Sequence, residues 1–115
     1  MTVYLLVRGD EVALRKRDEN GLLAGLWEFP HVPGKLAESG AAAPLSDWGL
    51  TAKNWEKTLT ARHIFTHVEW RMTGYVVAVA GENSGFVWVN REELEKFAVP
   101  SAFAKFLTEA RNELA

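Results

Sequence analysis

At the start of the chain, the apolar pattern predicts a β-hairpin followed by a compact apolar segment. Residues 2–7 form a short run of strand-forming residues, residues 8–11 have turn chemistry, and residues 12–17 alternate between apolar and polar. Residues 25–30 read Gly-Leu-Trp-Glu-Phe-Pro and end in proline. We expect this segment to be a short strand or a turn packed on the sheet.

The middle of the chain passes from an irregular connection to an alternating strand. Residues 31–44 are rich in Gly, Ala, Pro and Ser and predict an irregular connection. A short helix at residues 44–48 is expected to end at Gly49. Residues 55–63 alternate, with Leu59 and Ala61 on one face, which predicts a strand.

A second alternating segment follows, and its parity changes midway. Its apolar positions are first Val68, Trp70 and Met72 and then Tyr75, Val77 and Val79. Because one inserted residue moves the following side chains to the other face of a strand, this change predicts a β-bulge around Gly74. Residues 81–85 then predict a turn, and residues 86–89 predict a further strand.

The end of the chain is predicted to be helical. Asn90 and Glu93 have the spacing of a capping box, and Ser101, after Pro100, is the expected cap of a second helix. The apolar residues of that helix fall on one stripe: Phe103, Phe106, Leu107, Ala110 and Leu114. Strands followed by helices predict an α+β or α/β sandwich, a mixed sheet with flanking helices, in one domain spanning residues 1–115.

Composition narrows the classes of function. The chain has 115 residues, the size of one domain, and 13 basic against 15 acidic residues give a net charge of -2. This balance excludes a strongly basic surface and leaves only a local patch for nucleic acid. The absence of cysteine excludes disulfides, thiolate zinc sites, iron–sulfur clusters and cysteine nucleophiles within the sequence. No apolar run is long enough to cross a membrane, so we expect an intracellular protein.

Three motifs, in order along the chain, carry a family resemblance. They are Gly-Leu-Leu-Ala-Gly-Leu-Trp-Glu-Phe-Pro at residues 21–30, His-Ile-Phe-Thr-His at residues 63–67 and Val-Pro-Ser-Ala-Phe-Ala-Lys-Phe at residues 99–106. Together they span nearly the whole chain and resemble the C-terminal domain of MutY-type A/G-specific adenine DNA glycosylases. The resemblance implies a Nudix-like fold and a role in base excision repair of DNA.

The second motif carries the implied binding site. In the family this loop approaches the 8-oxoguanine that lies opposite a mispaired adenine. The resemblance therefore implies that Phe65, Thr66 and His67 contact the lesion or shape the loop that does. Thr66 stands where the family usually has serine, which keeps the hydroxyl group but adds a methyl group and stiffens χ1.

Other basic and aromatic residues are assigned either to phosphate contacts or to structural roles. Phosphate contacts are predicted for three basic residues near this loop in sequence: Lys57, Arg62 and Arg71. The densest basic run, residues 15–17, lies at the end of the predicted hairpin and is interpreted as a solvated edge. Trp27, Glu28 and His63 are interpreted as structural residues.

A Nudix hydrolase is the competing enzymatic hypothesis. Such an enzyme holds magnesium on a diphosphate with several glutamates of one helix. Aligning that signature from Gly34 places other residues at the glutamate positions, namely Gly40, Gly49, Ala52 and Lys53, and a shortened alignment keeps only Asp47 as an acid. The sequence therefore predicts that the metal-binding helix is degenerate and that this domain has neither a metal site nor a catalytic residue.

The resemblance implies that a parent protein supplies the chemistry. Adenine removal in the family needs a carboxylate in a helix-hairpin-helix domain and an iron–sulfur cluster, and both belong to a catalytic domain acting in cis. The implied partner is double-stranded DNA containing 8-oxoguanine:adenine mispairs, bound by a monomer in the cytoplasm, at the nucleoid in a bacterium. Two alternatives stay open: a pyrophosphohydrolase of oxidised nucleotides and a non-catalytic protein-interaction adaptor.

Overall fold

The first two strands pair as the sequence predicts. The computed structural model describes residues 1–114, and in it β1 (Thr2–Arg8) and β2 (Glu11–Lys16) form an antiparallel hairpin. Gly9, in the turn between them, has a φ of 63°. A residue without a Cβ adopts this left-handed conformation at little cost.

A mixed sheet is built outward from β1, which is largely buried. On one side β6 (Glu69–Gly81) runs parallel to β1, and the edge strand β5 (Leu50–Ile64) runs antiparallel to β6. On the other side β1 pairs with β2. Three short strands complete the sheet: β3 (Trp27–Glu28) and β7 (Val87–Val89) pair with β2, and β4 (His31–Val32) pairs with β1.

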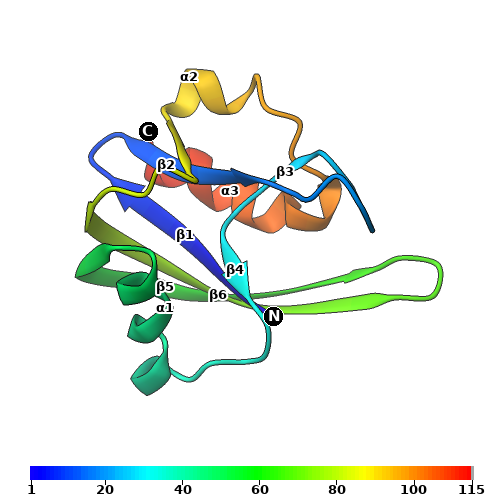
Figure 1. Ribbon diagram of the computed structural model, residues 1–115, viewed down its shortest axis with the longest axis horizontal. Helices are drawn as coiled ribbons and strands as arrows, with labels where there is room; N and C mark the ends of the chain where they lie inside the picture. Colours follow the sequence, from blue (N-terminus) through cyan, green and yellow to red (C-terminus); the bar gives the residue numbers. More distant parts are fainter. Residues whose placement is uncertain (115) are drawn as a thin grey trace.

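Helices cover both faces of this sheet (Figure 1). One face holds η2 (Ser101–Phe103), α3 (Ala104–Glu113) and α2 (Arg91–Leu94), whose apolar side chains join one buried cluster. The opposite face holds η1 (Glu38–Gly40) and α1 (Ala42–Asp47) beside a second cluster. The predicted sandwich of a mixed sheet with flanking helices is therefore confirmed.

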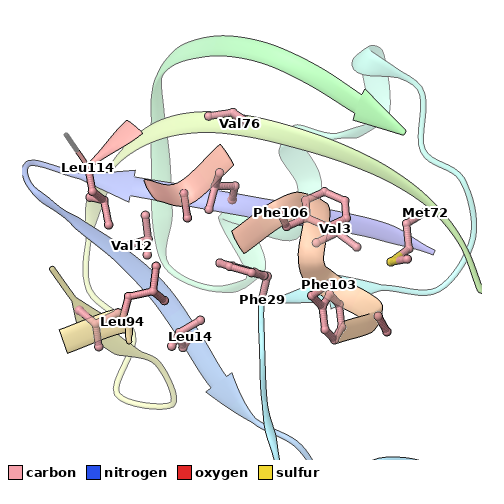
Figure 2. Close-up of a cluster of buried hydrophobic side chains, with 14 residues drawn as sticks. Val3, Val12, Leu14, Phe29, Met72, Val76, Leu94, Phe103, Phe106 and Leu114 are labelled. Carbon is pink, nitrogen blue, oxygen red and sulfur yellow. The ribbon is translucent and has the colours of Figure 1, made fainter. Parts of the chain in front are cut away.

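Aromatic contacts build the core between α3 and the sheet (Figure 2). Phe29 lies against Phe103 and Phe106, with ring centres 6.2 and 6.3 Å away, and all three side chains are fully buried. The helix approaches β6 closely at Gly74, where an added Cβ would lie 2.2 Å from Phe106 Cε1. Because protein interiors are close-packed, α3 can lie this near the sheet only with glycine at position 74.

The bulge expected around Gly74 is wrong. Strand β6 is continuous through Gly74, and the register shifts occur instead in β5, within residues 52–57. The apolar parity of β6 changes because its second half is buried on both faces. Val76 belongs to the cluster on the α3 side, whereas Tyr75 and Val77 belong to the cluster on the α1 side.

The helix ends agree only in part with those predicted from the sequence. Asn90 and Glu93 form the predicted capping box, in which each side chain accepts the backbone N–H of the other at 2.8 and 3.0 Å. The predicted cap at Ser101 is wrong, because Ser101 opens η2 and Phe103 takes the N-cap of α3 without a side-chain hydrogen bond. No helix within residues 1–114 is long and apolar enough to cross a membrane.

The predicted irregular connection at residues 31–44 contains two short elements, β4 and η1. The helix expected at residues 44–48 is α1, which begins earlier, at Ala42. Gly49 follows its C-cap with a φ of 77°, so the predicted end of this helix is confirmed.

Candidate nucleic-acid interface

The loop singled out by the sequence lies at the tip of a long hairpin. Strands β5 and β6 pair from end to end, and Figure 1 shows their distal part extending beyond the rest of the molecule. Thr66 and His67 connect the strands, and the Phe65 N–H donates to the Val68 carbonyl oxygen at 2.7 Å to close the hairpin. The side chains of both connecting residues are exposed. The predicted turn between two strands is therefore confirmed.

Phe65 anchors this tip to the core. Its half-buried ring stands edge-on to His63 and Trp70, with ring centres 4.5 and 5.0 Å away. Trp70 in turn has its ring centre 5.7 Å from that of Phe103, so an aromatic series runs from the tip into the cluster beneath η2 and α3. The two exposed connecting residues are thus presented on a supported turn.

Two arginines face each other across the hairpin behind its tip. Arg62 and Arg71 are direct cross-strand partners, so their side chains leave the same face of the hairpin. They share one carboxylate: Glu69 Oε1 lies 3.6 Å from Arg62 Nε and 3.2 Å from Arg71 Nε. Their side chains are 64% and 81% exposed. Like charges directly opposite each other destabilise a sheet, and one glutamate leaves this pair with a net positive charge.

A groove of about 610 Å³ runs beside the two arginines. The hairpin forms one wall, and the turn at Gly34 and Lys35 contributes to the other. Because Ala61 packs on the α3 side, the neighbouring Arg62 and the groove lie on the opposite face. Lys35 is exposed and adds a third positive side chain, which the sequence did not single out because it stands alone among Gly, Pro and Ala.

Lys57 is not brought to the tip. Its Nζ lies 2.9 Å from Oε1 of Glu109 on α3, and this hydrogen bond and the carboxylate charge raise the pKa of Lys57. Ile64 lies seven positions after Lys57 on β5, a distance of about 23 Å along the strand. Of the three predicted phosphate contacts, the structure therefore groups Arg62 with Arg71 and leaves Lys57 apart.

A charge cluster around the buried carboxylate of Glu28 replaces the solvated edge expected at residues 15–17. Glu28 is 4% exposed, and its two carboxylate oxygens accept hydrogen bonds from Arg15 Nε at 2.9 Å and Arg17 Nη1 at 2.5 Å. Lys16, between the two arginines, points the other way, and its side chain is 54% exposed. The interpretation of the run as a solvated edge is wrong for both arginines. Their spacing of two residues places both side chains on one face of an extended segment, but that they face Glu28 follows from the pairing of β2 with β3.

His31 completes this cluster. Its Nδ1 lies 3.6 Å from Glu28 Oε1 and 3.2 Å from the Phe29 carbonyl oxygen. Burial lowers the pKa of His31 below its ordinary value of 6.5, while the Glu28 carboxylate acts in the opposite direction. The cluster therefore holds two guanidinium groups, one carboxylate and a histidine whose neutral form is favoured.

The degenerate metal-binding helix expected from the sequence is α1. Its six residues contain a single acid, Asp47. Within residues 1–114, no group of three or more His, Cys, Asp or Glu side chains is arranged to hold a metal ion. Mg²⁺ demands near-octahedral oxygen coordination, which a helix with a single carboxylate does not provide. The donor set of α1 does not fit a divalent cation, and its buried residues, such as Leu45, pack against the sheet.

Comparison with known proteins finds related sequences. A family model described as NUDIX domain matches residues 2–109. The chain is 30% identical over 109 residues to the adenine DNA glycosylase of Homo sapiens and 31% identical over 98 residues to that of Schizosaccharomyces pombe. These matches cover 84% and 71% of this chain but 20% and 21% of those proteins. The chain thus spans about a fifth of the length of the curated relatives it matches.

Solved structures share the architecture. The C-terminal domain of mouse MUTYH, crystallised in complex with human PCNA, has a TM-score of 0.68 at 25% identity and covers 97% of this chain and 86% of that chain. A Nudix hydrolase from M. smegmatis, RenU, has a TM-score of 0.66 at 18% identity, with coverage of 97% and 83%. The second likeness shows the fold alone. The resemblance and the fold predicted from the three sequence motifs are both confirmed.

Proposed function

Because this chain belongs to the NUDIX domain family, we propose that it uses the Nudix fold to recognise damaged DNA. In this proposal the domain binds 8-oxoguanine opposite a mispaired adenine in double-stranded DNA and so assists an adenine glycosylase domain in cis. The observation that carries the proposal is the supported hairpin tip, which presents Thr66 and His67 to solvent while Phe65 holds the turn against Trp70.

The tip offers the chemistry that lesion discrimination requires. 8-Oxoguanine differs from guanine by a carbonyl oxygen and an N–H, so a reader must aim a few hydrogen bonds at one base edge. The Thr66 hydroxyl can donate and accept, a neutral His67 ring offers one donor and one acceptor, and the turn adds backbone N–H groups. Because the core holds the Phe65 ring, the loop is already ordered before binding. Little conformational freedom is then lost when DNA binds, which favours affinity. We therefore assign Phe65 to shaping the loop, and Thr66 and His67 to contacting the lesion.

The arginine pair supplies phosphate contacts near the tip. Arg62 and Arg71 leave one face of the hairpin and carry a net positive charge, so they suit the DNA backbone flanking the recognised base. Lys57 is proposed as a phosphate contact only for DNA that continues along the hairpin, about 23 Å from the tip. Its ion pair with Glu109 makes it the weakest of the three.

The relatives support the proposal that recognition and catalysis belong to separate domains of one protein. The chain matches about a fifth of each glycosylase, and the structural neighbour is the C-terminal domain of mouse MUTYH. We infer that residues 1–115 form one domain of a longer DNA-repair glycosylase whose remaining part holds the catalytic carboxylate and the iron–sulfur cluster. It would act as a monomer in the cytoplasm, at the nucleoid in a bacterium.

Equilibrium binding tests this function. Fluorescence anisotropy with two labelled duplexes, one carrying 8-oxoguanine:adenine and one carrying guanine:adenine, gives the two Kd values at one salt concentration. We expect the lesion duplex to bind about tenfold more tightly, since one good base-edge contact contributes about 1–3 kcal/mol. Equal Kd values for the two duplexes would show that this domain does not read the lesion.

A further inference from the structure

The hairpin tip exposes two large apolar side chains that the recognition loop does not explain. Ile64 is 62% exposed and Val68 is 46% exposed, the highest values among the large hydrophobic residues within residues 1–114. They stand immediately before and after the turn residues, Ile64 at the end of β5 and Val68 just before β6. Single exposed hydrophobic residues are common, but here two of them flank one projecting turn.

The two side chains lie on both faces of the hairpin. Ile64 pairs with Glu69 and alternates with Arg62, so it shares the face of the two arginines. Val68 is joined to Phe65 by the closing hydrogen bond and alternates with Trp70, so it belongs to the α3 side. Apolar surface therefore flanks the Thr66–His67 connection on each side.

The neighbouring charges indicate what covers this surface. Arg62 and Arg71 lie behind Ile64 and share the single carboxylate of Glu69, so the occupant is anionic as well as apolar. Duplex DNA combines both properties, because its phosphates surround stacked bases. DNA-binding proteins use this combination when an apolar side chain wedges between base steps and basic residues hold the backbone. A second copy of this chain fits less well, because a symmetric contact would bring two arginine pairs together.

We propose that the tip is an apolar wedge for duplex DNA. Ile64 and Val68 are buried against the bases of a step that opens on binding, while Arg62 and Arg71 hold the adjacent phosphates. The inference rests on the proposed function and deepens it, because it states how the tip reaches a base inside the duplex. The wedge acts on damaged and undamaged DNA alike, whereas Thr66 and His67 provide the preference between them.

Salt titration of two double variants separates the wedge from the charges. We expect Ile64→Ala with Val68→Ala to weaken duplex binding about tenfold, the equivalent of about 1.4 kcal/mol, at every salt concentration. The slope of log affinity against log salt should stay unchanged, because no phosphate contact is lost. We expect Arg62→Gln with Arg71→Gln to reduce that slope by about 1.8, at about 0.9 for each contact. Leu22→Ala, which shortens another exposed apolar side chain, should bind like the wild type.

A base analogue reports the opening directly. When 2-aminopurine stands beside the target base, its fluorescence should rise as the wild type binds, because the base step opens. At saturating concentration of the Ile64→Ala, Val68→Ala variant, the 2-aminopurine fluorescence should stay low. Wild-type affinity and wild-type fluorescence in that variant would overturn the wedge. Self-association that disappears in the variant, measured by sedimentation, would also overturn it and identify a second copy as the occupant. If the Ile64→Ala, Val68→Ala variant binds both duplexes more weakly but keeps the wild-type ratio of affinities for the lesion and normal duplexes, the wedge is supported. The recognition proposal then also stands.

Discussion

The guanidinium carbon of Arg17 lies 5.0 Å from the centre of the Trp70 ring. Arg17 is held by the buried carboxylate of Glu28, and Trp70 supports Phe65, so this contact connects the charge cluster to the hairpin tip. A cation over an aromatic face contributes about 0.5–2 kcal/mol. We therefore expect Arg17→Ala to loosen the tip without unfolding the domain.

Hydrogen exchange measures this loosening. In Arg17→Ala, the Phe65 amide that bonds to Val68 should exchange about 2- to 30-fold faster, as the contact energy implies. The Leu5 amide, in the central strand, reports the global loss of stability from the broken Glu28 ion pair, and the acceleration at Phe65 should exceed the acceleration at Leu5. Arg62→Ala, on the opposite face, serves as the control and should leave Phe65 unchanged. Identical exchange at Phe65 in Arg17→Ala and wild type would show that Arg17 does not support the tip.

The close contact between Gly74 and Phe106 makes a prediction about stability. A Cβ at position 74 would overlap the buried Phe106 ring, so Gly74→Ala should lower the free energy of unfolding by about 1–3 kcal/mol, the usual cost of overpacking. Gly40→Ala is the matched control, because a Cβ there meets nothing within 4 Å. Denaturant unfolding of both variants checks this, and equal midpoints would contradict the packing described for α3.

The charge cluster makes stability depend on pH through His31. Burial holds the pKa of His31 below its ordinary value of 6.5, so the folded protein binds this proton less readily than the unfolded chain. The resulting stability is present above pH 6.5 and is lost as the pH falls toward the folded pKa. Between roughly pH 7.5 and 5.5, the Tm of the wild type should fall more than that of His31→Gln. Parallel curves for the two proteins would mean that folding leaves this pKa unshifted.

The composition of α1 predicts the outcome of a hydrolysis assay. With Asp47 as its only acid, this helix should support no magnesium-dependent hydrolysis of oxidised nucleoside triphosphates or of diphosphate-linked nucleosides. Release of pyrophosphate or phosphate is the measurement. Turnover that disappears in Asp47→Ala would revive the hydrolase hypothesis and contradict the assignment of α1 to structure.

Local sequence signals predicted most of the architecture. The hairpin at the start of the chain, the Asn90 capping box and the apolar stripe of α3 depend on neighbours within a few residues, and all are present. The bulge at Gly74 was wrong because alternation cannot distinguish an inserted residue from a strand that becomes buried on both faces. Gly74 instead accommodates Phe106, a contact between segments far apart in the chain.

The sequence predicted those parts of the candidate site that depend on residues close together in the chain. The turn at Thr66 and His67 was placed correctly, and Arg62 and Arg71 meet because they lie at matching positions on either side of it. Lys57 was grouped with them by sequence proximity, but an extended strand carries it away from the tip. The partners of Glu28 and the approach of Lys35 to the groove depend on pairing and chain crossing, which no local pattern specifies.

Lesion preference in a loop variant tests the central claim most directly. The measurement is the ratio of Kd values for guanine:adenine and 8-oxoguanine:adenine duplexes, taken for the wild type and for Thr66→Ala with His67→Ala. Both side chains are exposed, so the variant should keep its fold while the ratio falls from about ten toward one. Lys57→Ala, about 23 Å along the strand, should keep the wild-type ratio. A folded loop variant with the full preference for the lesion would contradict the account.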